Sequence, residues 1–477
     1  MSTSTAPTSD TAIVWFRRDL RLEDHPALLE AVSGSSQVLP LFVLDDRLLD
    51  QAAPARAWLL QQSLRALDRS LRARGSGLLV RRGRPEVIVP EVATEFDASV
   101  VLATRDVTPL SYRRDRAVAT ALERAGSRLA LRPGLLLVEP ERLLTAGGTP
   151  YGVFTPFWRA LQAAPRRELL PAPEQIPTPP AALPEQSWAD ARPADVDPPL
   201  PDLPEPGEAA ASARLTAWVA GGLADYAGDR DALSGSGTSR LGADLHLGTL
   251  SPLQVESAAL EAGVDSTPFV RQLAWREFYH HLLFHRRSGG DAVESPLLAA
   301  FRSEEDDPEA VSAWRAGRTG IPVVDAAMRQ LLATGWLSNR ARLVVASFLT
   351  RHLLMDYRIG ERHFMRHLVD GDVANNRGGW QWTAGVGADP QPWFRIFNPV
   401  RQGSRFDPDG SWVRRWVPEL ANVPDRYIHA PWEMPPDVAA SAGVRLGTAY
   451  PRPIVDLAAG RERALAAFKA ASETSGS

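Results

Sequence analysis

The first 134 residues alternate between β-branched runs and amphipathic segments, and this alternation limits the possible folds more than any other feature of the chain. Five short apolar runs predict strands, and four segments with apolar residues three or four apart predict helices between them. Strands separated by helices form a parallel sheet. The pattern predicts a doubly wound, Rossmann-like five-stranded sheet over residues 11–134, after a disordered tail at 1–10. The expected strands are 12–16, 38–44, 77–81, 98–103 and 128–131.

The loops after these strands lack the two standard nucleotide-binding sequences. Neither G-x-G-x-x-G nor a Walker A sequence follows any of the five runs. Such glycine-rich loops hold dinucleotides and triphosphates against a helix N-terminus. The first domain is therefore not a nicotinamide- or ATP-binding domain of the usual kind, and its fold alone does not name a ligand.

A proline-rich stretch at 165–207 separates this region from the rest of the chain. Prolines and acidic residues at this density cannot sustain a helix or a strand ladder, so we expect an interdomain linker over 135–210, able to lie across a surface. After it, apolar residues recur at helical spacing. We expect an all-helical domain over 211–468 and a tail at 469–477. The clearest predicted helices are 267–286, 323–332, 339–355 and 361–368.

Composition excludes several classes of protein. The chain has no cysteine, which rules out disulfides, thiolate metal sites and cysteine nucleophiles. No apolar run approaches the roughly 20 residues of a membrane span, and no signal-peptide pattern is present, so we expect a cytoplasmic protein without membrane contact. The net charge of −4 excludes a global polycation. Residues 310–416 nevertheless contain 15 Arg against 8 Asp or Glu, and 10 of the 14 tryptophans follow residue 210. A basic, tryptophan-rich face is typical of nucleic-acid binding.

Three short motifs have the residue types of a ligand site. The small residues, hydroxyls and guanidinium of 237–242 could cradle a diphosphate. Asp370 and Asp372 lack the further oxygen ligands of a calcium loop. His281 and His285 have zinc spacing on one helix face, but the glutamate of H-E-x-x-H and a third ligand are missing. We therefore expect no metal site.

Seven motifs, in order along the chain, together resemble one family. They are VWFRRDLRLEDHPAL, GTSRLGADLHLGTLSP, QLAWREFYHHL, VDAAMRQLLATGW, NRARLVVASFL, DGDVANNRGGWQW and FRIFNP. The chain resembles the photolyase/cryptochrome flavoproteins, and best the microbial photolyases that act on cyclobutane pyrimidine dimers. The resemblance covers nearly the whole chain outside the linker and the tails. It implies an antenna role for the first domain and FAD binding for the helical domain.

The resemblance assigns parts of the cofactor to particular residues. FAD would fold into a U, with its phosphates and ribityl chain held by Tyr226, Thr238, Ser239, Arg240 and Leu241. Beside the isoalloxazine, Arg342 would pair with Asp370, while Asp372 would contact the polar edge of the ring and Asn376 would face N5. A buried cation and an amide at N5 can keep a reduced flavin a strong electron donor.

The implied partner is DNA that carries pyrimidine dimers. The dimer is flipped out of the duplex, and Trp275 and Trp382 would stack on it, at about 1–3 kcal/mol per base. Asn339, Gln272 and Asn376 would complete the catalytic pocket. Four arginines would contact phosphates whatever the base sequence: Arg276, Arg340, Arg395 and Arg405. In the family's reaction blue light excites FADH⁻, an electron passes to the dimer, the cyclobutane ring splits, and the electron returns.

The sequence departs from the family pattern at several positions. Gln272 stands where many members have a glutamate, and an amide cannot lend a proton. Leu343 stands where the dimer branch commonly has methionine. In the tryptophan series that carries electrons to the flavin, Trp380 matches the first member, Tyr357 replaces the second, and no tryptophan marks the third. Tyrosine is hard to oxidise unless its proton leaves too. Other electron paths would use Trp314, Trp336 or Trp393.

The antenna and the exact function have more than one reading. Asp106 matches the deazaflavin-binding pattern better than the methenyltetrahydrofolate pattern, which favours a deazaflavin as the antenna chromophore. The other possibilities are a second flavin or no antenna chromophore. A cryptochrome-type blue-light photoreceptor, or a six-four photoproduct repair enzyme, would use the same scaffold. The paired histidines of the six-four type are absent from 339–343. A flavin oxidoreductase would need a nicotinamide site, which the sequence lacks. We expect a monomer.

Overall fold

The computed structural model describes residues 10–49, 53–179, 200–235, 237–286, 295–390, 392 and 394–474. Contacts divide the chain into two compact units. The first unit comprises Met1–Pro199, Leu203–Ala224 and Ser239–Gly290, and the second comprises Leu200–Asp202, Asp225–Thr238 and Asp291–Ser477. Of the expected terminal tails, residues 1–9 and 475–477 lie outside the described residues.

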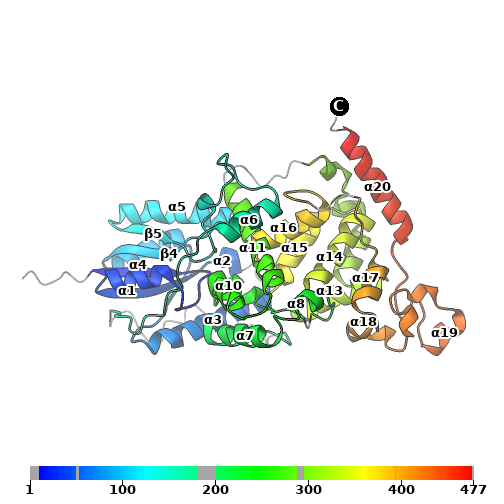
Figure 1. Ribbon diagram of the computed structural model, residues 1–477, viewed down its shortest axis with the longest axis horizontal. Helices are drawn as coiled ribbons and strands as arrows, with labels where there is room; N and C mark the ends of the chain where they lie inside the picture. The colour runs from blue at the N-terminus through cyan, green and yellow to red at the C-terminus, as the bar shows by residue number, and fades with distance from the viewer. Residues whose placement is uncertain are drawn as a thin grey trace, which may run out of the picture. The chain divides into compact units, whose positions relative to one another are not determined.

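The first unit is built on the predicted parallel sheet (Figure 1). Its strands lie in the order β3-β2-β1-β4-β5, and every neighbouring pair is parallel. All residues of β1 are buried, as expected for a parallel strand with helices on both faces of its sheet. The strand order reverses between β1 and β4, where doubly wound folds bind ligands. The bounds are β1 (Thr11–Phe16), β2 (Gln37–Leu44), β3 (Leu79–Arg82), β4 (Ala98–Thr104) and β5 (Arg128–Arg132).

Four longer helices connect the strands, and each begins with a proline. Proline presets a helical φ and lacks the N–H that the first turn leaves unpaired, so it favours a helix start. Helices α4 and α5 pack on each other, α4 also packs on β4, and α5 also packs on β5, while α1 packs on β1 and β4. The predicted doubly wound fold is confirmed. The bounds are α1 (Pro26–Gly34), α3 (Pro54–Arg72), α4 (Pro85–Glu95) and α5 (Pro109–Arg124), with a short α2 (Asp46–Leu49) before α3.

The proline-rich segment lies along the sheet domain as far as it is described. The Val38 amide donates to the Pro177 carbonyl at 2.6 Å, and the Ile176 amide donates to the Arg74 carbonyl at 2.9 Å. This segment therefore uses its backbone groups to extend the hydrogen bonding of the first unit. Residues 180–199 of the expected linker lie outside the described residues.

Among the described residues, five further α-helices belong to the first unit. Helix α6 lies inside the stretch that was expected to be linker, and it packs against α11. Helix α10 packs on α7 and α11, and α7 also contacts α3. By contacts, the early part of the expected 211–468 domain thus groups with the sheet. The bounds are α6 (Phe154–Ala163), α7 (Glu208–Gly221), α9 (Gly242–Leu247), α10 (Pro252–Leu260) and α11 (Thr267–Arg286).

The second unit is mostly helical, as predicted. Helix α13 packs on α12, α14, α17 and α18, while α14 and α15 both pack on α16. The expected helix at 339–355 is interrupted, because α14 ends at Ser347 and a π-helical turn, Phe348–His352, follows. Helix α20 continues past residue 468. The bounds are α8 (Tyr226–Asp229), α12 (Pro308–Arg315), α13 (Pro322–Thr334), α14 (Asn339–Ser347), α15 (Tyr357–His367), α16 (Val373–Ala384), α17 (Pro399–Phe406), α18 (Ser411–Trp416), α19 (Pro436–Ser441) and α20 (Leu457–Thr474).

The buried carboxylate of Asp325, on α13, binds the segment that contains Tyr450. Asp325 and Tyr450 are both fully buried. Asp325 accepts hydrogen bonds from the Tyr450 hydroxyl at 2.6 Å, from the Thr319 amide and hydroxyl at 2.6 Å, and from the Gly320 amide at 3.0 Å. Burial raises the pKa of the Asp325 carboxyl, and the four donors reduce this effect without cancelling it.

Candidate active site

The predicted diphosphate loop runs from the second unit into the first, changing unit between Thr238 and Ser239. Tyr226 begins α8, and its burial raises the pKa of its hydroxyl to about 12. The Thr238 hydroxyl donates to the Gly235 carbonyl at 3.1 Å. Gly235, at φ +70°, packs so closely under the Trp336 ring that no other side chain fits there. Trp336 therefore supports this loop.

The remaining loop residues precede α9 in the first unit. The Leu241 amide donates to the Ser239 hydroxyl at 3.4 Å, and Arg240 has a left-handed φ of +54°. Such a turn, with its backbone amides, the Ser239 hydroxyl and the exposed Arg240, offers donors of the kind that a diphosphate needs. The residues present thus fit the phosphate end of FAD.

An ion pair joins α14 to the loop before α16. One Nη of Arg342 contacts both carboxylate oxygens of Asp370, at 2.8 and 3.1 Å. The Arg342 Nε donates to the Leu337 carbonyl at 3.0 Å. The backbone contact fixes the guanidinium, and the structure therefore forms the pair that the sequence analysis expected.

Helix α16 carries three of the predicted residues on one face. Asp372 caps its N-terminus, accepting from the Asn375 amide at 2.9 Å, and it is 5% exposed. Asn376 and Trp380 follow at steps of four residues, which places them on the same stripe of the helix. The Asn376 amide nitrogen donates to the Glu361 carbonyl at 2.9 Å. Its Oδ1 is thereby oriented as an acceptor, which suits the N5–H of a reduced flavin.

Trp380 lies in an aromatic cluster of the second unit. Its ring centroid is 5.0 Å from that of Phe364 and 6.1 Å from that of Trp314, both in edge-to-face orientation. Gly360 of α15 meets the ring directly, since a Cβ there would overlap it. Tyr357 is also buried, but among the described residues no ring contact joins it to Trp380. Of the other expected electron carriers, Trp336 packs on the Gly235 loop and Trp393 lies outside the described residues.

Trp275 stands on an aromatic platform in the first unit. Phe154, at the start of α6, stacks on it with ring centroids 3.8 Å apart and planes 6° from parallel. Phe278 meets the indole edge-on at 5.7 Å. Trp275 keeps partial exposure, as does Gln272 one turn earlier on α11. A partly exposed indole held from behind is suited to stacking on a base.

The two predicted pocket residues of the second unit are also accessible. Trp382 is partly exposed, two residues beyond Trp380 and therefore on a different face of α16. Asn339 is exposed at the first position of α14, whose N-cap is Ser338. Of the two tryptophans of α16, Trp380 is thus buried and Trp382 is accessible to a ligand.

The four predicted phosphate contacts fall into two groups. Arg395 and Arg405 are exposed. Arg340 is half-buried; it donates to Asp231 at 2.7 Å and lies 4.4 Å over the Phe406 ring. Arg276 is 8% exposed, and it donates to Glu277 at 2.7 Å and to the Leu135 carbonyl at 3.1 Å. In this conformation Arg276 does not offer its guanidinium to a phosphate.

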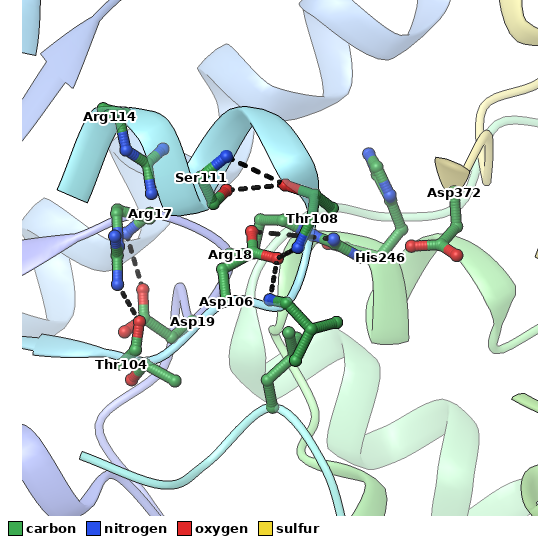
Figure 2. A network of polar contacts seen from close by, with 12 residues as sticks. Arg17, Arg18, Asp19, Thr104, Asp106, Thr108, Ser111, Arg114, His246 and Asp372 are labelled. Carbon is green, nitrogen blue, oxygen red and sulfur yellow. Dashed lines mark hydrogen bonds and ion pairs between the residues drawn. The ribbon is translucent and has the colours of Figure 1, made fainter. Parts of the chain in front are cut away.

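The carboxyl ends of β1 and β4 carry a buried polar network (Figure 2). Asp106 accepts from the Val107 amide at 2.6 Å and the Thr108 amide at 3.1 Å, and it lies 3.8 Å from Arg18. Burial disfavours its charge, but the positive charges of Arg18, Arg114 and Arg17 outweigh burial and lower the pKa of Asp106 to about 2. Asp106 is therefore a buried anion at the switch point of the sheet.

Arg17 and Arg114 share the carboxylate of Asp115. Arg17 donates to Asp115 at 2.6 Å and also to the Thr104 carbonyl, while Arg114 donates to Asp115 at 2.9 Å. Both guanidinium groups lie over the Trp15 ring, at 4.8 and 4.9 Å. With Arg18, this edge of the sheet holds three arginines and three aspartates, Asp19, Asp106 and Asp115, and their formal charges balance.

The described residues contain no group of three or more histidine, aspartate or glutamate side chains placed to hold a metal. His281, half of the histidine pair considered above, instead bonds the Val138 carbonyl at 3.0 Å, and its burial lowers its pKa to about 3. No helix in the described parts of the chain is long and apolar enough to cross a membrane.

Two family models match the chain. The DNA photolyase model matches residues 12–180, and the model of the FAD binding domain of DNA photolyase matches residues 269–470. The chain belongs to the DNA photolyase family. It is accordingly an enzyme, and FAD is its cofactor.

Named relatives of this family resemble the chain over nearly its whole length. A deoxyribodipyrimidine photo-lyase of Agrobacterium fabrum is 41% identical, over 99% of this chain and 100% of the relative. A bacterial class III photolyase from Agrobacterium tumefaciens has a TM-score of 0.90 at 39% identity, covering 99% of this chain and 100% of the other. A Synechocystis cryptochrome has a TM-score of 0.86 at 32% identity, covering 97% and 100%. A protein named cryptochrome thus has a fold very similar to that of this chain.

Two residues that support the predicted tryptophans were not identified from the sequence: Phe154, which stacks on Trp275, and Gly360, which packs against Trp380. Phe154 fell in the stretch expected to be linker, although the aromatic residues of YGVFTPFW were a visible sign of packing. Gly360 has no signal of its own, because only the folded structure brings it against Trp380.

Proposed function

We propose that the protein repairs cyclobutane pyrimidine dimers in DNA by light-driven electron transfer. The main support for this proposal is the arrangement of side chains on helix α16. Its buried face holds Asp372, Asn376 and Trp380, and its partly exposed face offers Trp382. The family's relatives named deoxyribodipyrimidine photo-lyase support the same substrate class.

The cofactor supplies the electron, and the chain supplies its surroundings. Reduced FAD, when bound and excited by blue light, donates an electron to the dimer and receives it back. Arg342, paired with Asp370, holds positive charge near the flavin, and Asn376 holds an acceptor where N5–H is expected. The loop with Thr238 and Ser239 binds the phosphates.

Substrate binding requires the dimer to leave the duplex, which costs a few kcal/mol and less for a damaged step. In the proposal Trp275 and Trp382 each stack on the flipped dimer, and Asn339 and Gln272 bond its polar edges. An amide at Gln272 can donate and accept, so it can bond a pyrimidine carbonyl without supplying a proton. Arg395 and Arg405, both exposed, contact phosphates.

We infer that the switch point of the sheet is the antenna site. The carboxylate of Asp106 can accept from hydrogen-bond donors of a chromophore, and Arg18, 3.8 Å away, can donate to its acceptors. We propose a deazaflavin over methenyltetrahydrofolate, because Asp106 matches the deazaflavin-binding pattern better. Extraction of the purified protein and absorption spectroscopy test it: a second chromophore of the deazaflavin type supports the assignment, and a folate or no chromophore overturns it.

A photoreceptor function is the second candidate, favoured by the Synechocystis cryptochrome of similar fold. The two functions are separated by illuminating the reduced protein with two DNA duplexes, one with a single thymine dimer and one with a six-four photoproduct. We expect restored thymines from the dimer only, and only in the light. Absence of dimer repair with reduced FAD bound would favour the photoreceptor, while repair of the six-four duplex would identify the other lesion.

A further inference from the structure

Helix α11 carries two arginines near Trp275, and they differ in their surroundings. Arg276 directly follows Trp275, about 100° further around the helix. Its guanidinium is bound by Glu277 and the Leu135 carbonyl, inside the first unit. Glu277 is fully buried and also accepts from the Leu137 amide at 2.7 Å. Arg276 therefore neutralises a buried carboxylate, and removing it would leave that charge unpaired.

Arg271 has the opposite character. It lies four residues before Trp275, so the two side chains share one face of α11 with neighbouring Cβ atoms. Arg271 is exposed. Within the described part of the chain it forms no hydrogen bond and no ion pair, and its guanidinium carries five N–H donors.

Phe154 connects Arg271 to Trp275. The Arg271 guanidinium carbon lies over the Phe154 ring, 5.5 Å from its centroid, and the same ring stacks on Trp275 at 3.8 Å. A guanidinium over an aromatic face is held by cation–π attraction of about 0.5–1 kcal/mol at an exposed site. The arginine is thus oriented beside the indole without losing its donors.

We propose that Arg271 is the phosphate-binding arginine of α11, in place of Arg276, and that Phe154 positions both Arg271 and Trp275. This inference rests on the proposed function, because it takes Trp275 to be the residue that stacks on the flipped dimer. A phosphate beside the flipped nucleotide then meets a planar guanidinium, which binds phosphate oxygens in a bidentate manner. The contact carries no base sequence information, so it adds affinity for any flanking sequence.

The test is the salt dependence of DNA binding by the FAD-loaded protein. A fluorescent duplex with one thymine dimer is titrated at salt concentrations from about 50 to 200 mM, for wild type, Arg271→Gln and Arg276→Gln. Each lost phosphate contact reduces the slope of log K against log salt by about 0.9. If wild type and Arg271→Gln bind equally near 1 M salt, this change makes Arg271→Gln about eightfold weaker at 0.1 M.

Two further variants serve as controls. Arg124→Gln removes the same charge from an exposed position on α5 and is expected to keep the wild-type slope. Arg271→Lys restores a charge and is expected to restore most of the slope. Arg276→Gln is expected to keep the slope and to lower the unfolding temperature.

A wild-type slope for Arg271→Gln, or a reduced slope for Arg276→Gln, would overturn the inference. Neither result would touch the proposed function, which is judged separately from the wild type: dimer-specific binding and light-dependent repair support it, and their absence refutes it. Phe154→Leu supplies a second check, because it should weaken dimer binding while FAD occupancy, read from absorbance at saturation, stays unchanged.

Discussion

Replacing Gly360 with alanine tests the packing of Trp380. A Cβ at Gly360 would lie 2.0 Å from the Trp380 ring, whereas carbon atoms pack at about 3.5–4.0 Å. The ring or helix α15 must therefore move by at least about 1.5 Å. Trp380 is 2% exposed and bounded by Trp314 and Phe364, so its movement disturbs the core of the second unit.

The size of the effect follows from two opposing contributions. Overpacking a core costs about 1–3 kcal/mol, while alanine gains about 0.8–1 kcal/mol over glycine inside a helix. Gly379 provides the matched control, because it is also within a helix and a Cβ there would meet nothing within 4 Å. The propensity gain is common to both variants. The difference in unfolding free energy between Gly379→Ala and Gly360→Ala is therefore the overpacking cost, about 1–3 kcal/mol.

Thermal unfolding of the FAD-loaded variants measures this difference. For domains of about 150–250 residues, 1 kcal/mol shifts the midpoint by about 2–4 °C. We expect Gly379→Ala to melt above wild type and Gly360→Ala to melt below Gly379→Ala by at least this amount. We also expect slower flavin reduction by an external thiol under blue light in Gly360→Ala. A midpoint for Gly360→Ala equal to that of Gly379→Ala would refute the close packing of Trp380 on α15.

Three further predictions concern other parts of the structure. The Trp380 ring contacts Trp314, whereas no ring contact among the described residues joins it to Tyr357. Trp314→Phe should therefore slow light-driven flavin reduction strongly and Tyr357→Phe only slightly, while repair by prereduced protein stays unchanged in both. A larger effect of Tyr357→Phe than of Trp314→Phe would contradict an electron path through the ring contact. Tyr450→Phe removes a donor from buried Asp325 and should lower the free energy of unfolding by about 1–3 kcal/mol in denaturant titrations; no loss would show that the carboxylate does not need that donor. The pKa of Asp106 is lowered to about 2 in the folded protein, from an unfolded-state value near 4. At pH values above 4 its charged form therefore stabilises the fold by roughly 2 kcal/mol, and this stabilisation is lost as the pH falls from about 4 to 2. The stability difference between wild type and Asp106→Asn should therefore shrink over that range, and a constant difference would count against the buried anion.

The sheet domain could be predicted from the sequence because its signals are local. Apolar runs and helical spacing agree, so the five predicted strands lie close to their observed bounds and the four longer helices lie between them, as expected. The segment at 339–355 was harder. Its helical spacing continues across the π-helical turn Phe348–His352, and only packing in the second unit reveals the break.

The candidate site could be predicted in its residues but not in their surroundings. The motif around Trp380 indicated which side chains carry chemistry, while burial separated Trp380 from Trp382. The arginines of α11 are the clearest example of side-chain surroundings that the sequence does not predict. In the sequence Arg276 is simply next to Trp275, and its burial depends on Glu277 and on the Leu135 carbonyl, which lies 141 residues away along the chain.

The proposed lyase reaction is driven by light and has no net redox change, so each protein molecule should repair many dimers. Prereduced, FAD-loaded protein is illuminated without oxygen or external reductant, in the presence of a large excess of dimer-containing DNA. We predict many restored dimers per protein molecule, with the flavin still reduced at the end. One restored dimer per protein molecule or fewer, with the flavin oxidised in proportion, would contradict the account.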